Sequence, residues 1–160
     1  MAKLQFKGLE EYEAQLLKLR GLTEQMIGEA IYEGAAIVAD EVKKGIESIP
    51  IDDRYATGGT MLHGITQEQK QGLLDGFGIA SMQNENGYLH VKLGFNGYNS
   101  MRTKNFPNGQ PNSMIARSVN SGSSFRQRIP FVDNAVTSAK SRAEEKMKQK
   151  LDEAIEKAIK

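Results

Sequence analysis

The chain has no cysteine and no tryptophan among its 160 residues. Without cysteine it has no disulfide, no thiolate metal ligand and no cysteine nucleophile. No apolar run approaches the roughly 18 residues that a membrane-spanning helix needs, and residues 1–8 lack the apolar region of a signal peptide. We therefore expect no membrane partner, and a protein that is made and assembled in the cytosol.

A strong charge of one sign is also missing, because 21 basic and 20 acidic residues give a net charge of +1. The chain as a whole is therefore not expected to bind polyanions or to act as an acidic solvating tail. Hydrophobic residues make up 39% of the chain and charged residues 26%, which is typical of a globular protein. We expect one domain that spans residues 1–160.

The first third of the chain carries apolar residues at helical spacing. Residues 9–19 have the spacing of one helix face, and Gly21 is expected to break this segment. Thr23 is then expected to cap a long helix over residues 23–49, since its hydroxyl can accept an N–H of the first turn. Gly34 lowers the helix propensity by about 1 kcal/mol, and close packing against a neighbour is one reason for a glycine there.

A second long helix is expected at the end of the chain. Pro130 opens it, because a missing N–H costs nothing in the first turn. About 30 residues of helix would be roughly 45 Å long, whereas a compact chain of this length is about 30–35 Å across. We therefore expect residues 145–160 to project, to fray, or to pack on a neighbouring subunit.

The middle of the chain indicates strands and short helices. Apolar and polar residues alternate over residues 88–95 after Asn86 and Gly87, which favours a hairpin in which residues 79–83 pair antiparallel with residues 88–95. Short helices are expected over residues 67–74 and 113–119, and a short strand before Gly8. The fold class is therefore α+β: a small antiparallel β-sheet packed against two long α-helices, one near the N-terminus and one C-terminal, with short helices in the connections.

The sequence offers no recognisable catalytic or metal-binding constellation. His63 and His90 lie far apart and lack the paired spacing of a zinc site, so we expect solvated or singly hydrogen-bonded histidines. Asp52 and Asp53 could bind a cation, but a loop aspartate more often accepts backbone N–H bonds. Phosphate-loop and nucleophile-elbow motifs are absent. We predict that the protein binds neither a cofactor nor a metal and that it is not an enzyme.

One electrostatic feature stands out. Residues 86–132 contain six lysines and arginines and no aspartate or glutamate, and aromatic residues lie between the basic ones. Such a segment can contact an acidic surface of a partner protein, can simply face water, or can bind nucleic acid by phosphate neutralisation and base stacking. The residues that we predict to contact a partner are Arg102, Lys104, Phe106, Arg117, Phe125, Arg126 and Arg128.

The chain resembles a family of tailed-phage proteins over nearly its whole length. The family is the head–tail joining or tail-completion family, the gene-product-ten-like family of the Hong Kong coliphage type. The residues that carry the resemblance are 4–12 (LQFKGLEEY), the end of the alanine-rich helix at 42–44 (VKK), 72–79 (GLLDGFGI), 91–95 (VKLGF), 116–124 (ARSVNSGSS) and 129–135 (IPFVDNA). The stretch Gly-Tyr-Asn-Ser looks like versions from siphophages or prophages of Gram-positive bacteria. Asn120 stands where an acidic residue is common in the family.

The resemblance implies a non-catalytic minor structural protein of the virion that forms an oligomeric ring at the head–tail junction. Its implied partners are copies of itself, head-completion or connector proteins and the tail tube protein, with DNA passing transiently through the ring lumen. It also implies structural roles for Gly122, for Pro130 and for Phe131, which would anchor the last helix in the core. The alternative that the residues leave open is a small nucleic-acid-binding module that uses residues 86–132.

Overall fold

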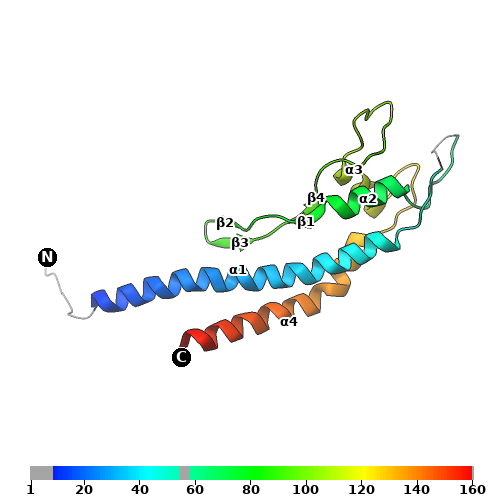
Figure 1. Cartoon of the computed structure of the whole chain (residues 1–160). Helices are drawn as coiled ribbons and strands as arrows, with labels where there is room; N and C mark the ends of the chain where they lie inside the picture. Colours follow the sequence, from blue (N-terminus) through cyan, green and yellow to red (C-terminus); the bar gives the residue numbers. More distant parts are fainter. Residues whose placement is uncertain (1–8, 55–57, 160) are drawn as a thin grey trace.

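The computed structural model describes residues 9–54 and 58–159, and it describes the side chains from residue 23 onward within those ranges, up to residue 158. Two long helices dominate it: α1 spans Leu9–Ser48 and α4 spans Phe131–Ile159. They run side by side in opposite directions, and a small β-hairpin and one of two short helices lie against α1 (Figure 1). The predicted α+β class is confirmed. The predicted strand before Gly8 lies outside the described residues.

The first helix is longer and more continuous than predicted. Gly21 lies inside α1, so the expected break there is wrong, and Thr23 is an interior residue and not an N-cap. A single glycine costs about 1 kcal/mol of helix propensity. That cost does not end a helix whose neighbouring residues are good helix formers, as the leucine, lysine, arginine and glutamate around Gly21 are.

Small residues allow α1 and α4 to approach closely. A Cβ atom on Gly34 would lie 3.3 Å from the carbonyl oxygen of Ala143, and one on Gly45 would lie 3.3 Å from that of Phe131. Ala143 is itself buried. Glu41 of α1 bridges to Arg142 of α4 at 3.1 Å across the same seam. The expectation that Gly34 serves close packing is confirmed.

The hairpin consists of two short antiparallel ladders and not of one continuous ladder. Strand β1 (Phe77–Ile79) pairs with β4 (Leu93–Phe95), and β2 (Gln83–Glu85) pairs with β3 (Tyr88–His90). The pairing partners Ile79↔Leu93 and Gln83↔His90 leave three residues on one side facing two on the other. This extra residue is a β-bulge, which bends and twists a hairpin.

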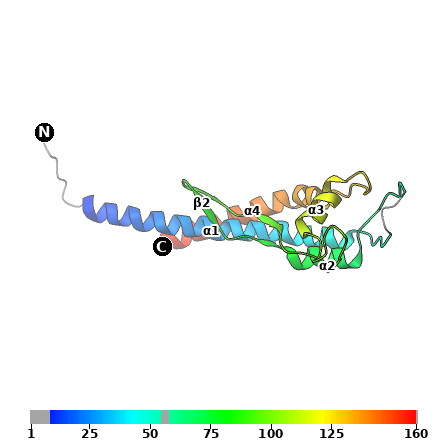
Figure 2. The same cartoon turned by 90° about the horizontal axis from the view of Figure 1, so that it is seen from above.

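The tip of the hairpin has the predicted turn. Asn86 has φ 55° and Gly87 has φ 89°, and positive φ at both central residues is the signature of a type I′ turn. From the core the hairpin runs back along α1 (Figure 2). There the Tyr32 hydroxyl accepts a hydrogen bond of 2.8 Å from the backbone N–H of Met82. The hairpin is therefore attached to α1 far from the core.

The core lies at one end of the molecule. The short helices α2 (Gln67–Gly76) and α3 (Asn112–Ser121) meet β1, β4 and the adjoining ends of α1 and α4 there (Figure 1). Both short helices agree with prediction to within two residues at each end. Three phenylalanine rings contact one another in this core. The ring centroids are 5.0 Å apart for the tilted pair Phe77 and Phe95, and 6.1 Å apart for the edge-to-face pair Phe95 and Phe131. Burial of such rings supplies the main favourable term in folding.

Away from the core, the two long helices form an arm, which we define as residues 9–36 of α1 and 143–159 of α4. The far half of α4 extends from the core together with α1, and α1 continues past the end of α4 (Figure 1). A shallow groove between Met26 of α1 and Ala154 and Ala158 of α4 marks where the two helices still contact each other near the tip. Across the described residues, no helix is both long and apolar enough to cross a membrane.

Candidate functional site

Asp52 organises the loop that follows α1. Its carboxylate accepts hydrogen bonds from Arg54 Nε at 2.8 Å and Nη2 at 2.7 Å, and from the backbone N–H of His63 at 2.8 Å. These hydrogen bonds hold the pKa of Asp52 well below its usual range. The Arg54 guanidinium makes the largest contribution to this shift, and the backbone N–H of His63 makes the next largest. The prediction that a loop aspartate accepts backbone N–H bonds is confirmed for Asp52, which is buried, whereas Asp53 is exposed.

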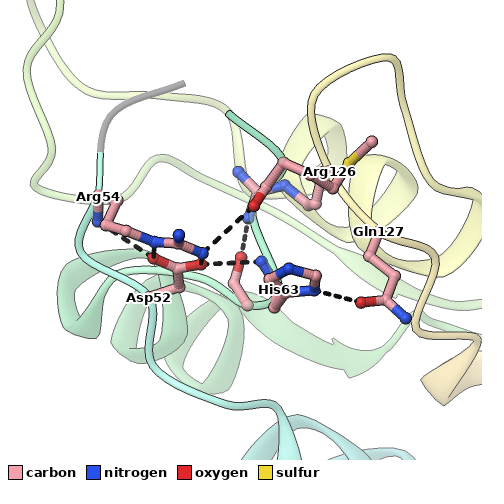
Figure 3. A network of polar contacts seen from close by, with 7 residues as sticks. Asp52, Arg54, His63, Arg126 and Gln127 are labelled. Carbon is pink, nitrogen blue, oxygen red and sulfur yellow. Dashed lines mark hydrogen bonds and ion pairs between the residues drawn. The ribbon is translucent and has the colours of Figure 1, made fainter. Parts of the chain in front are cut away.

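A distant segment meets this loop. The backbone N–H of Leu62 donates to the carbonyl of Phe125 at 2.8 Å, and that of Gln127 donates to the carbonyl of Leu62 at 2.8 Å. Leu62 is thereby paired with the segment on both sides of Arg126, whose side chain turns inward. Figure 3 shows Arg126 and Gln127 placed against the segment that carries Asp52, Arg54 and His63. The Gln127 side-chain oxygen also bonds the His63 ring.

Arg126 is the most unusual residue of this network. Only 4% of its surface is exposed, and its Nη1 donates to the carbonyl of Gly64. Its Nε is buried without an acceptor. Burial lowers the pKa of Arg126, and the nearby charge of Asp52 acts in the opposite direction. Its burial does not fit the predicted role of Arg126 as a contact residue for a partner.

A pocket of about 160 Å³ opens beside Arg126. Its walls come from three parts of the chain: the loop after α1 with the start of α2, the loop between β4 and α3, and the segment after α3. Phe125 stands at this pocket with 44% of its surface exposed, and the Arg126 guanidinium carbon lies 5.9 Å from its ring centroid. The structure therefore brings two of the predicted contact residues, Phe125 and Arg126, to one site.

The other predicted contact residues are placed differently. Arg102, Lys104 and Arg117 are exposed and Phe106 is half-buried. Arg128 is exposed, and its Nη2 lies 3.2 Å from a carboxylate oxygen of Asp133. Residues 86–132 contain no acidic residue, but Asp133 pairs with Arg128 from just outside the segment.

The residues predicted to be structural occupy the junction between α3 and α4. Gly122 has φ 77°, and a Cβ atom there would lie 3.1 Å from Cβ of Arg128. Pro130 precedes α4, and its carbonyl accepts the N–H of Asn134 at 2.9 Å. Phe131 is buried in the core. Glycine suits the left-handed backbone that turns the chain from α3 toward α4.

Sequence reasoning missed the residue that caps α4. The Asn120 side-chain oxygen accepts the backbone N–H groups of Val132 at 3.0 Å and of Asp133 at 3.3 Å. These are first-turn donors that have no partner inside the helix. Asn120 belongs to α3 and lies more than ten residues before the helix that it caps, so no local motif announces this role.

The two histidines do not form a metal site. The His63 ring is singly hydrogen-bonded, as expected, whereas the His90 side chain is only 17% exposed and is therefore not solvated. Its Nδ1 is buried without a partner, and its Nε2 lies 3.8 Å from a carboxylate oxygen of Glu85. Within residues 9–54 and 58–159, no three histidine or acidic side chains cluster in a way that could hold a metal ion.

Comparison of the chain with protein-family models, with curated proteins and with solved structures finds no match.

Proposed function

We propose that the chain is a structural subunit of a tailed phage that joins head and tail as part of a ring, and that it does so without catalysis. The observation that carries the proposal is the elongated form of the molecule. Its core is confined to one end, while the arm and the β2–β3 hairpin extend from it (Figure 2). Together with the family resemblance of the sequence, this form suits a protein that works through its surfaces.

The extended parts carry apolar side chains that the chain itself leaves in water. The exposed fractions are 39% for Tyr32, 70% for Tyr88 and 48% for Ile155. Aromatic residues such as Tyr32 and Tyr88 are enriched where proteins contact each other. A ring uses two different surfaces of each subunit, and it closes when the rotation between neighbours fits. In the proposed ring, the arm and the β2–β3 hairpin provide these surfaces.

The proposal is tested by deleting the coding sequence from the phage that carries it. We expect DNA-filled heads and separate tails in the lysate, since the proposed ring forms the connection between them. Supplying the chain from a plasmid should restore tailed particles, and mass spectrometry should detect the chain in purified virions. Tailed, infectious particles from the deletion, or virions without the chain, would refute the proposal.

Native mass spectrometry and negative-stain imaging of the purified chain test its assembly directly. Rings, or subunits that assemble on isolated tail tubes, support the proposal. A monomer that binds DNA with a steep salt dependence and ignores tail tubes would instead favour the nucleic-acid-binding alternative. In that case, replacing the exposed Arg102 and Lys104 by glutamate should abolish DNA retention.

A further inference from the structure

The guanidinium of Arg126 has few hydrogen-bond partners among the described residues. An arginine side chain offers five N–H donors, and the structure gives Arg126 one acceptor among the described residues, the carbonyl of Gly64. Nε is buried and has none. Buried polar groups in folded proteins are nearly always hydrogen-bonded. Arg126, with 4% of its surface exposed, therefore carries a buried donor for which the described residues supply no acceptor.

The charges around the pocket do not balance. Asp52 is the nearest anion, but its carboxylate is already held by Arg54 at 2.7 and 2.8 Å. Asp52 and Arg54 neutralise each other, so the positive charge of Arg126 is left over. An uncompensated buried charge is costly, and one additional negative charge would remove the imbalance.

The pocket beside Arg126 has the size and the walls for a small anion with an apolar stem. Its volume of about 160 Å³ exceeds the roughly 30 Å³ that one water molecule occupies in the liquid. Leu62, Met101 and Phe125 supply apolar surface. The charged residues Asp52 and Arg54 also line the pocket. An aspartate or glutamate side chain combines a single negative charge with methylene groups in the same way.

We infer that this pocket binds a carboxylate group, with the guanidinium of Arg126 as the cationic partner and the apolar walls around the adjoining carbon atoms. Hydrogen bonds between a guanidinium and a carboxylate are among the strongest in proteins. The carboxylate comes either from a small free acid or from an acidic side chain of another protein. The inference does not depend on the proposed phage function, because the pocket is complete within one chain.

The test is a titration of the arginine Nε–H resonances in an ¹⁵N-labelled sample of the full chain. Sodium acetate is the probe, and sodium chloride at equal ionic strength is the control. We expect one arginine resonance to shift saturably with acetate and not with chloride, and the Arg126→Lys variant to lack that resonance. If Arg126→Lys does not fold, triple-resonance assignment of the wild-type chain identifies the resonance instead.

A second variant tests the charge argument without touching Arg126. Arg54 has a side chain that is 56% exposed, so Arg54→Gln is expected to fold. In that variant Asp52 loses its ion-pair partner, so the negative charge of Asp52 offsets the positive charge of Arg126. Acetate binding should therefore weaken severalfold. Unchanged acetate affinity in Arg54→Gln would overturn the charge argument, and with it the inference.

Matched probes separate the possible sources of the carboxylate. N-acetyl-glutamate N-methylamide mimics an acidic side chain in a protein, and its glutamine counterpart is the neutral control. Tighter binding of the glutamate probe than of acetate indicates a protein partner, and equal binding indicates a free acid. Three results would overturn the inference: equal binding of the glutamine probe, a preference for inorganic phosphate, or an Arg126 resonance that no anion shifts.

Discussion

Gly34 of α1 and Met147 of α4 meet so closely that a Cβ atom on residue 34 would lie 2.6 Å from Met147 Cγ and 2.7 Å from Met147 Sδ. The absent side chain at residue 34 thus makes room for the methionine. This contact lies within the arm, where few other elements cover the two helices. It fixes how closely α1 and α4 pack outside the core.

Replacing Gly34 by alanine tests this contact. Alanine favours the helix by about 1 kcal/mol, but overpacking of a tight contact costs about 1–3 kcal/mol. We expect Gly34→Ala to lower the free energy of unfolding by up to about 2 kcal/mol. In a double-mutant cycle measured by urea denaturation, Met147→Ala should recover at least about 1 kcal/mol of that loss. Strictly additive effects would show that the two residues do not constrain each other.

Phe131 should be the residue whose truncation destabilises the core most clearly. It is 4% exposed and its ring packs against Phe95. Phe131→Ala should lower the free energy of unfolding by about 3–5 kcal/mol. Tyr98→Ala is the control, because Tyr98 is 68% exposed, and it should change stability by less than about 0.5 kcal/mol. Under the proposed function, Phe131→Ala also blocks tail attachment while heads still form. Normal plaque numbers with full protein abundance would contradict that role.

Asp52 should make stability depend on pH in the acid range. Its pKa lies below the ordinary value of 3.8 in the folded protein, so the unfolded chain binds a proton more readily than the folded chain. The stabilising contribution is complete above that ordinary value and is lost as the pH falls from there through the folded pKa. Urea midpoints should therefore differ most between wild type and Asp52→Asn near neutral pH, and the difference should shrink toward pH 3.

The exposed neighbour provides the control for this prediction. Asp53→Asn removes one negative charge from the same loop without removing a partner of Arg54. Its urea midpoint should follow that of the wild type at every pH. If Asp52→Asn and Asp53→Asn behave alike, the effect of Asp52 comes from general charge and not from its hydrogen bonds.

Only a residue 120 whose side chain carries a hydrogen-bond acceptor should be able to cap α4. Asn120→Ala leaves two first-turn N–H groups of α4 without a partner and should cost about 1 kcal/mol. Asn120→Asp keeps the acceptor and adds a negative charge at a helix N-terminus, so it should be neutral or stabilising. Thermal unfolding of the two variants checks the order, and equal losses in both would exclude the capping role.

Features that depend on local spacing could be predicted from the sequence. Periodicity along the sequence predicts the two long helices and the two short ones. The chemistry of neighbouring residues predicts the Asn86–Gly87 turn. The predicted break at Gly21 was wrong because glycine was read alone, although its neighbours favour helix. The bulge was missed because alternation along residues 88–95 says nothing about how many residues the partner strand contains.

The candidate site could be predicted only in part, because it depends on contacts between distant segments. Arg126 lies in a segment that reads as a solvated basic loop. Its burial follows from the pairing of Leu62 with residues 125 and 127, and no pattern near either residue indicates that pairing. The role of Asp52 in its own loop is local chemistry, and that role was anticipated.

The length of α1 has a mechanical consequence. With 40 residues it is roughly 60 Å long, and the core holds it at one end. A rotation of the core by about 10° would therefore swing Leu9 through roughly 10 Å. If identical copies were fixed at their cores, small differences in angle would become large displacements at the N-terminal ends of α1. The distance between those ends would then report the angle between neighbouring copies most sensitively.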